Sequence, residues 1–214
     1  SELLAGQVGA QDSHLAVVDT VTHYLYRALG WDAYFRNDFM GYNRANVTTE
    51  KQQAGTTWAG RYRAFLNLPK MVQRAEDHFG ASGIEGVELE NSDAAGCRGV
   101  CLESRVYNGE VMASPPYARD MRFSDATHAW TFSGDVRYLR PAAKSAISLA
   151  YFEETGWYQP SYLEADHLSW GDGAGNDFVK QGCKTWAAQG GEASRYLCKP
   201  EYEPALYTRT SLES

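Results

Sequence analysis

The amino-acid sequence predicts a helix-rich α+β fold in which a few helices carry long, structured loops. Three segments combine helical spacing of apolar residues with helix start or stop signals: one that ends at Gly30, one from Pro69 to Gly80, and one from Pro141 to Gly156. Between about residues 80 and 138 the chain is rich in Gly, Asn, Ser and Pro. The short apolar alternations there, in GIEGVELEN and SRVYNGEVMASPPY, predict brief strands joined by irregular loops.

Composition and charge restrict the class of protein. The 214 residues are 43% hydrophobic and 22% charged, which is typical of one or two folded domains with a sizeable core. A formal net charge of -7 and the lack of a basic stripe argue against nucleic acid as a partner. No stretch approaches the ~18 continuous apolar residues of a membrane helix, so we expect no transmembrane segment. The start SELLAGQVGA has neither region of a signal peptide, as expected of a processed chain or a piece of a longer precursor.

The segment THYLYRALGW lies in the first predicted helix, which Asp12 or Ser13 can cap and Gly30 can end. Apolar residues recur at helical spacing and form one stripe: Val18, Val21, Leu25 and Leu29. His23 and Arg27 share another face, roughly opposite this stripe. Taken alone, the pattern favours a helix that packs its apolar stripe and leaves His23 and Arg27 in water.

Residues 156–186, GWYQPSYLEADHLSWGDGAGNDFVKQGCKTW, resemble the leishmanolysin family of zinc endopeptidases, whose members carry a G-W/F-Y…WG…AGCDF…KC pattern. Upstream, MVQRAEDHFG with IEGVELEN, and then GVCLESRVYNGEVMAS, are similar to further family segments in the family's order. The resemblance covers residues 13–186 and implies the catalytic-helix and carboxy-terminal portion of a metzincin fold. Residues 1–12 would then be an amino-terminal extension, and residues 187–214 a carboxy-terminal tail.

In this register HYLYRALGW falls on the family's H-E-x-x-H-A-L-G-F helix. The resemblance implies that His23 matches the first zinc ligand, Tyr24 the general base and Arg27 the second ligand. Cys101, in CLESR, stands where the third His is expected, and Met112 matches the methionine beneath the metal. A metzincin site needs two His on one helical face, a Glu between them and a third His from farther along the chain.

The chemistry of the substituted positions argues against a working zinc site. A phenol with a pKa near 10 cannot replace a carboxylate as the base at neutral pH. The guanidinium of Arg27 has no lone pair to donate and stays charged, and we expect it to fill the space of the metal and to face Glu103 or Glu110. His23 and Cys101 remain as residual candidate ligands. We therefore predict no catalytic residue, no metal and no cofactor: a pseudoprotease that acts as a binding or structural subunit of a larger assembly.

Two alternatives stay open. One is an active zinc metalloendopeptidase with non-standard ligands, for which His78, His128 and His167 are the candidates. Plainer roles suit these residues; His78, for example, stands at the end of a helix, where a cation is favourable. The other alternative is a scaffold subunit in which the old peptidase fold serves only for packing.

The four cysteines allow three connectivities. The resemblance implies a bridge between Cys183 and Cys198, and Cys97 and Cys101 could form a second, local one; in a reducing compartment all four would be free thiols. A further family pair is replaced here by Ala81 and Asn176, so both halves of one bridge are absent together.

Location and partner follow from the resemblance as well. It implies an extracellular, cell-surface or luminal location, in which Asn46 of the NVT triplet would be a glycosylation acceptor. In the family, a sheet subdomain precedes the zinc helix, and this sequence has no room for it before that helix. We therefore expect the fold to lack the amino-terminal sheet subdomain, and another polypeptide to supply it or to cover the apolar stripe.

Overall fold

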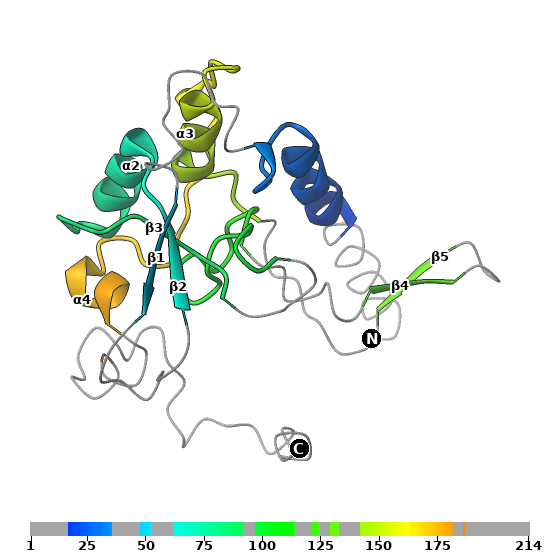
Figure 1. Cartoon of the computed structure of the whole chain (residues 1–214). Helices are drawn as coiled ribbons and strands as arrows, with labels where there is room; N and C mark the ends of the chain where they lie inside the picture. The colour runs from blue at the N-terminus through cyan, green and yellow to red at the C-terminus, as the bar shows by residue number, and fades with distance from the viewer. Residues whose placement is uncertain are drawn as a thin grey trace, which may run out of the picture.

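The computed structural model describes residues 17–35, 48–52, 62–91, 97–113, 121–124, 129–132, 142–181 and 186. Residues 17–28 are helical and are called the first helix below. The elements that follow it, in chain order, are β1 (Thr48–Gln52), β2 (Tyr62–Leu66), α2 (Pro69–Phe79), β3 (Val87–Leu89), β4 (Met121–Ser124), β5 (Ala129–Phe132), α3 (Ala146–Glu154), the 3-10 helix η4 (Tyr162–Glu164) and α4 (Gly175–Lys180) (Figure 1). Helices and small sheets thus mix, which confirms the α+β class.

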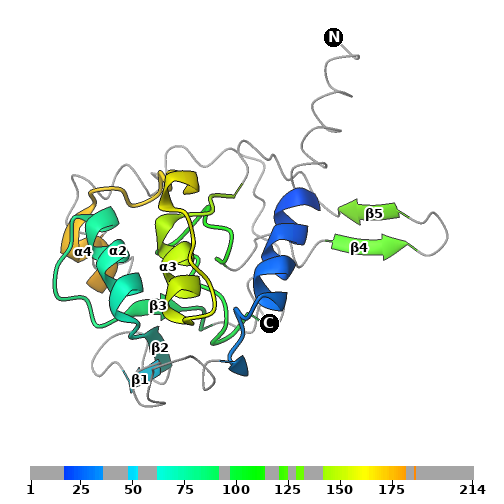
Figure 2. The same cartoon turned by 90° about the horizontal axis from the view of Figure 1, so that it is seen from above.

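Two antiparallel sheets are present in the described residues. One has the strand order β1-β2-β3, with Thr48 opposite Leu66 and Ala64 opposite Leu89. The other is the hairpin β4-β5, which lies on the far side of the first helix from α2 (Figure 2). The three-stranded sheet and α2 together frame one side of the core.

Helix α2 is where local sequence signals predict it. Pro69 occupies the first turn, where its missing N–H costs no hydrogen bond. Gly80 ends the helix in the left-handed conformation, with φ at 60°, and its N–H donates to the Glu76 carbonyl. The buried side chains Met71, Ala75 and Phe79 recur at helical spacing and face the core. The predicted helix from Pro69 to Gly80 is therefore confirmed.

Helix α3 begins later than the sequence predicts. It starts at Ala146, and the hydroxyl of Ser145 caps it by accepting a hydrogen bond from the Ile147 N–H. The residues before it pair with another segment: the Ala143 N–H donates to the Gly109 carbonyl, and the Ala143 carbonyl accepts from the Val111 N–H. Because these backbone groups are already satisfied across the chain, the predicted start at Pro141 is wrong.

The core lies between α2, α3, strands β2 and β3, and the turns of residues 97–113. Trp31, just after the first helix, is fully buried and stacks on Tyr151 of α3, with ring centroids 4.1 Å apart. Its indole N–H donates to the Val100 carbonyl at 2.9 Å, and the Tyr151 hydroxyl donates to the Gly30 carbonyl at 3.0 Å. These contacts fasten the end of the first helix to the rest of the core.

The first helix packs with the face opposite to the predicted one. The apolar stripe is exposed, at 43% for Val18, 52% for Val21, 55% for Leu25 and 45% for Leu29. Asp19 and His23 are buried instead. Each has a backbone hydrogen-bond partner, because the Asp19 carboxylate accepts from the Ala142 N–H and His23 Nδ1 bonds to the Val111 carbonyl. The expectation that His23 points to water is therefore wrong.

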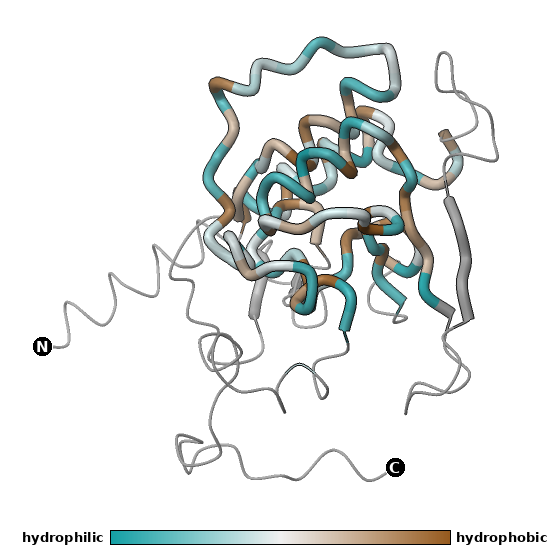
Figure 3. Tube along the Cα trace, turned by 90° about the vertical axis from the view of Figure 1, so that its left-hand side faces the viewer, coloured by the Kyte–Doolittle hydropathy of each residue, from teal (hydrophilic) through white to brown (hydrophobic). Residues whose placement is uncertain are grey.

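Hydrophobic and hydrophilic positions are interspersed along the described trace (Figure 3). Among the described residues, none of the helices combines the length and the apolar character needed to cross a membrane.

Candidate functional site

His23 lies buried at the contact between the first helix and residues 97–113. Its Nδ1 is 2.8 Å from the Val111 carbonyl oxygen, which can only accept, so Nδ1 carries the hydrogen and Nε2 carries the lone pair. Burial lowers the pKa of the imidazole, the hydrogen bond to Val111 opposes this, and the charge of Arg27 lowers the pKa further. His23 is thus a neutral imidazole with a fixed tautomer.

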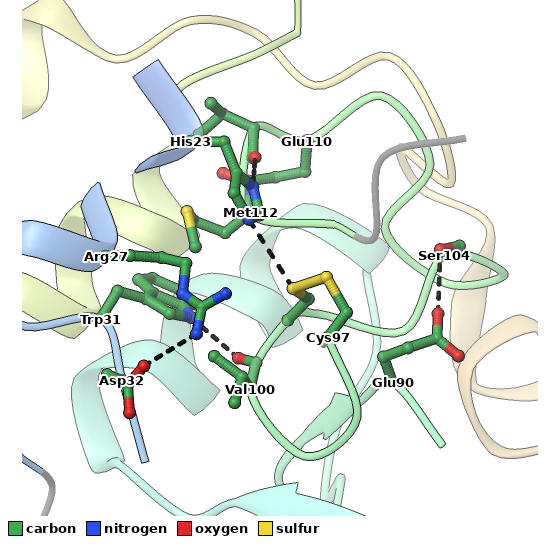
Figure 4. Close-up of a disulfide and its surroundings, with 12 residues drawn as sticks. His23, Arg27, Trp31, Asp32, Glu90, Cys97, Val100, Ser104, Glu110 and Met112 are labelled. Carbon is green, nitrogen blue, oxygen red and sulfur yellow. Dashed lines mark hydrogen bonds and ion pairs between the residues drawn. A yellow bond between two sulfur atoms is a disulfide. The ribbon is translucent and has the colours of Figure 1, made fainter. Parts of the chain in front are cut away.

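The lone pair of His23 faces a disulfide. Cys97 and Cys101 are joined by a bond between their sulfurs, and Cys101 Sγ is 3.8 Å from His23 Nε2 (Figure 4). Neither of these two atoms carries a hydrogen, so the pair is a van der Waals contact. The N–H groups of Val100 and Cys101 both donate to the Cys97 carbonyl at 2.9 Å, which folds the segment into a tight turn. The structure therefore contains the local bridge that the sequence left as one alternative.

Arg27 does not face Glu103 or Glu110 as expected. Its guanidinium bonds to the Asp32 carboxylate at 2.9 Å, and Figure 4 shows this pair beside Trp31. Asp32 also accepts from the Tyr34 N–H, so the turn after Gly30 presents the carboxylate to Arg27. Asp32 is the partner that the sequence interpretation missed; its only signal is an acidic residue just after the helix-ending glycine.

The other motif positions differ in burial. Tyr24 is 58% exposed, and its ring meets that of His23 edge-on at 5.7 Å. Met112 is fully buried, and its carbonyl accepts from the Leu102 N–H at 2.8 Å. The structure thus brings His23, Cys101 and Met112 into one buried region and leaves Tyr24 at the surface.

Glu110 holds the turn that carries Met112. Its carboxylate accepts hydrogen bonds from the Met112 N–H and from the N–H and hydroxyl of Ser145. Complete burial raises the pKa of Glu110 to about 7, although these hydrogen bonds oppose the rise. Glu110 therefore connects the methionine turn to the cap of α3 and is positioned as a structural residue.

Glu103 lies close to the carboxylates of Glu88 and Glu90. Burial first, and then the nearby Glu90 and Glu88, raise the pKa of Glu103 to about 7. Glu88 is the member of this group that pairs with cations, since it bonds to both Arg63 and Arg105.

Two of the three candidate substitute ligands, His78 and His167, do not join His23. His78 Nε2 bonds to the Trp170 carbonyl at 2.9 Å, and burial lowers the pKa of this His, so the cationic role at a helix end does not apply. His167 is exposed and lies 3.7 Å from Asp172. Among the described residues, the only group of three or more His, Cys, Asp or Glu side chains placed to hold a metal is His23, Cys97 and Cys101. His128 lies outside the described residues.

The zinc that the family resemblance implies does not fit the residues in this oxidised state. A catalytic zinc takes three protein ligands and a water. Of the three ligand positions only His23 offers a good metal donor, because the Cys101 sulfur is bonded to Cys97 and is not a thiolate, and the Arg27 guanidinium has no lone pair to give. We therefore derive no catalytic step through a metal.

One contact bears on the register of the family pattern. The Ser82 N–H donates to the Asn176 side-chain carbonyl at 3.0 Å, so Ala81 and Asn176 lie close together in space. These are the two positions at which the resemblance places a lost cysteine pair. Cys183, Cys198 and Asn46 lie outside the described residues.

Comparison with known proteins gives the family. The family model for leishmanolysin matches residues 5–132, more than half of the chain. A leishmanolysin-like peptidase of Caenorhabditis briggsae is 28% identical over 87% of this chain and 30% of the relative's own length. A ciliated left-right organizer metallopeptidase of Mus musculus is 30% identical over 81% of this chain and 22% of its own length, and a leishmanolysin of Leishmania donovani is 25% identical over 78% and 23%. The chain therefore spans less than a third of the length of these relatives, and it belongs to the leishmanolysin family of metallopeptidase-related proteins.

Proposed function

We propose that this chain is a non-catalytic member of the leishmanolysin family, a pseudoprotease that serves as a binding or structural subunit. The observation that carries the proposal is the state of the two ligand positions after His23. Arg27, at the second, is held by Asp32, and the sulfur of Cys101, at the third, is held in a disulfide. The leishmanolysin-like part proposed here extends over residues 13–186.

The position of the general base supports the same proposal. Hydrolysis of a peptide bond by a zinc peptidase needs a carboxylate that takes a proton from the attacking water. Tyr24 stands at that position, more than half exposed. Glu110, a buried carboxylate in the methionine turn, already accepts three hydrogen bonds from Met112 and Ser145. Its lone pairs are directed to the protein backbone and to a hydroxyl.

A cleavage assay with a matched variant tests this proposal. We expect the purified chain to show no peptide cleavage that a metal chelator removes. The His23→Gln variant separates activity of this site from a contaminating protease, because any cleavage that persists in His23→Gln does not come from the site. Chelator-sensitive cleavage by the wild-type chain that His23→Gln abolishes, with the variant still folded by circular dichroism, would establish an active peptidase and overturn the proposal.

We further propose that another polypeptide covers the exposed apolar face of the first helix, defined by Val18, Val21, Tyr24, Leu25 and Leu29. Each of these side chains is between 43% and 58% exposed. A contiguous apolar patch of this kind on a folded domain is typical of a protein-protein interface.

Purification of the tagged chain from its native source, beside a Val21→Arg/Leu25→Arg variant, tests the partner. We expect one polypeptide to copurify in a fixed ratio with the wild-type chain and to be lost from the variant. A polypeptide retained equally by both chains, or no stoichiometric partner at all, would contradict a docking role for this face.

An extracellular, cell-surface or luminal location completes the proposal. The Cys97–Cys101 disulfide supports it, because disulfides persist in oxidising compartments and are rare in the cytosol. Mass spectrometry of the native chain without reduction should find Cys97 and Cys101 linked. Two alkylatable thiols at these positions in freshly isolated protein would contradict the location.

A further inference from the structure

Three potential metal ligands meet where the first helix packs against the turn of residues 97–101. The ligand atoms of His23, Cys97 and Cys101 all lie within 4.8 Å of one another, and all three side chains are buried. Cys97 matches no ligand position of the family's zinc motif. The cluster therefore combines the residues at two ligand positions of the family register, His23 and Cys101, with Cys97, a donor from outside that register.

The distances suit a tetrahedral zinc ion once the disulfide is open. With Zn–N near 2.1 Å and Zn–S near 2.3 Å, two ligands of one tetrahedral site lie about 3.6 Å apart for N and S and about 3.8 Å for two sulfurs. His23 Nε2 and Cys101 Sγ are already 3.8 Å apart. The two sulfurs have to separate for both to bind one ion, and the spacing of Cys97 and Cys101 is within the C-x2–4-C range of zinc sites.

The orientation of His23 is that of a metal ligand. Its Nδ1–H donates to the Val111 carbonyl, and this hydrogen bond leaves the Nε2 lone pair directed at the cysteine pair. Zinc-binding His side chains are commonly held in this way by a backbone carbonyl. Because the Val111 N–H in turn donates to the Ala143 carbonyl, the segment that orients the ring is itself fixed.

We propose that reduction of the Cys97–Cys101 disulfide creates a buried Zn²⁺ site made of the His23 imidazole and two thiolates, and that the disulfide closes this site. The structure is the closed state, since a sulfur bonded to another sulfur is not a thiolate ligand. This site goes beyond the proposed function and does not depend on it, because a bound Zn²⁺ would still lack a carboxylate at Tyr24.

The opening step needs an external reductant, for which we name a dithiol. Two electrons and two protons pass from the dithiol to the two cysteine sulfurs; the S–S bond breaks, and the dithiol becomes a disulfide. Binding of Zn²⁺ then releases the two thiol protons to solvent. The two thiolates cancel the charge of the ion, so the cation of Arg27, already paired with Asp32, faces a site with no net charge. A water completes the fourth position.

Titration of the full chain with Co²⁺, a spectroscopic substitute for Zn²⁺, tests the site. The chain is used oxidised and after reduction with a phosphine, and Zn²⁺ is then added in competition. We expect the reduced chain to bind one Co²⁺ with thiolate charge-transfer absorption, at least about 100-fold tighter than the oxidised chain, because reduction creates two of the three ligands. His23→Gln should weaken binding at least about 10-fold, whereas the matched control His78→Gln, at a partly buried His outside the cluster, should not.

A second measurement needs no variant. The reduced wild-type chain is alkylated with and without Zn²⁺, and the labelled cysteines are identified by mass spectrometry. We expect Zn²⁺ to protect Cys97 and Cys101, with Cys183 and Cys198 as internal references. Equal labelling of Cys97 and Cys101 in both samples, or a reduced chain that binds Co²⁺ no better than the oxidised one, would overturn the proposal. Zn²⁺ binding without chelator-sensitive cleavage leaves the proposed function in place, so the two can fail separately.

Discussion

The first helix differs from the body, which is formed by α2, α3 and residues 97–113, in how much of the family pattern its side chains retain. In the body, residues of the segments that resemble the family make polar contacts with one another and with their neighbours. Glu88 bonds to Arg63 and Arg105, and Asn176 bonds to the backbone beside Ala81. In the first helix, one motif side chain, His23, keeps its chemistry. If the proposed site assignment holds, the scaffold of a metal site persists here without its donor set, because packing and coordination depend on different side chains.

The two regions are joined by a small set of contacts from Asp19, His23 and Trp31 to the body. All three side chains are buried, whereas the opposite side of the helix is exposed. The first helix thus packs against the body with one face.

Replacing Trp31 with Ala should have the largest effect. The change removes a fully buried indole that stacks on Tyr151 and leaves the Val100 carbonyl without its donor. We expect a loss of about 3–5 kcal/mol in the free energy of unfolding, measured by urea denaturation. Leu163→Ala, at a side chain 96% exposed, serves as the control and should cost less than about 1 kcal/mol. Similar losses for both variants would show that Trp31 does not fasten the first helix.

Gly171→Ala tests the packing of the body. A Cβ at Gly171 would lie 2.6 Å from Phe79 and 2.7 Å from Phe178, and φ there is +76°. Gly173 has a similar φ of +65° with nothing within 4 Å of the added Cβ, so Gly173→Ala measures the backbone strain alone. We expect Gly171→Ala to be less stable than Gly173→Ala by about 1–3 kcal/mol in thermal or urea unfolding. Equal stability of the two variants would mean that the aromatic rings move aside without cost.

Local signals explain why some elements could be predicted. The helix start signal at Pro69 and the stop signal at Gly80 affect only the adjacent turn of the backbone. Helix α2 begins at Pro69 and ends just before Gly80. The start of α3 could not be predicted from such signals, because the backbone of Ala143 pairs with residues 109–111, far away in the sequence. A helix propensity read from neighbouring residues contains no information about that pairing.

The candidate site shows the same limit. Periodicity correctly groups His23 with Arg27 and the apolar residues with one another, but it cannot say which face has a partner. The buried polar face is stable because Val111 and Ala142 offer backbone partners to His23 and Asp19, and both lie far along the chain. The family resemblance of the segment GVCLESRVYNGEVMAS placed Cys101 and Met112 beside the helix, whereas the ion pair of Arg27 with Asp32 had no comparable signal.

The carboxyl of Glu103 should make the body's stability depend on pH. Its pKa is raised from 4.5 to about 7, so between these values the folded chain holds a proton that the unfolded chain has released. This contribution is therefore fully present below pH ~4.5 and is lost as the pH rises through ~7. Glu103→Gln keeps the group neutral, and the stability of the variant relative to wild type should rise between pH 5 and pH 8, as measured by urea unfolding.

Glu110 provides the contrast to Glu103. Burial also raises its pKa to about 7, but both of its oxygens accept hydrogen bonds from Met112 and Ser145. An amide group in Glu110→Gln would place donors against these donors, so this variant should be destabilised at every pH. A pH-independent difference between wild type and Glu103→Gln would contradict the assignment of the titration to Glu103.

The smallest effect is expected on the exposed side of the first helix. Val21 and Leu25 are 52% and 55% exposed, so the double variant Val21→Ser/Leu25→Ser removes little buried surface. We expect its stability to remain within about 0.5 kcal/mol of wild type in urea unfolding. Asp19→Ala, on the buried side, should cost about 1–3 kcal/mol, because it leaves the Ala142 N–H without an acceptor. If the double variant were less stable than Asp19→Ala, the apolar face would belong to the core of this chain and would not be an interface for another polypeptide.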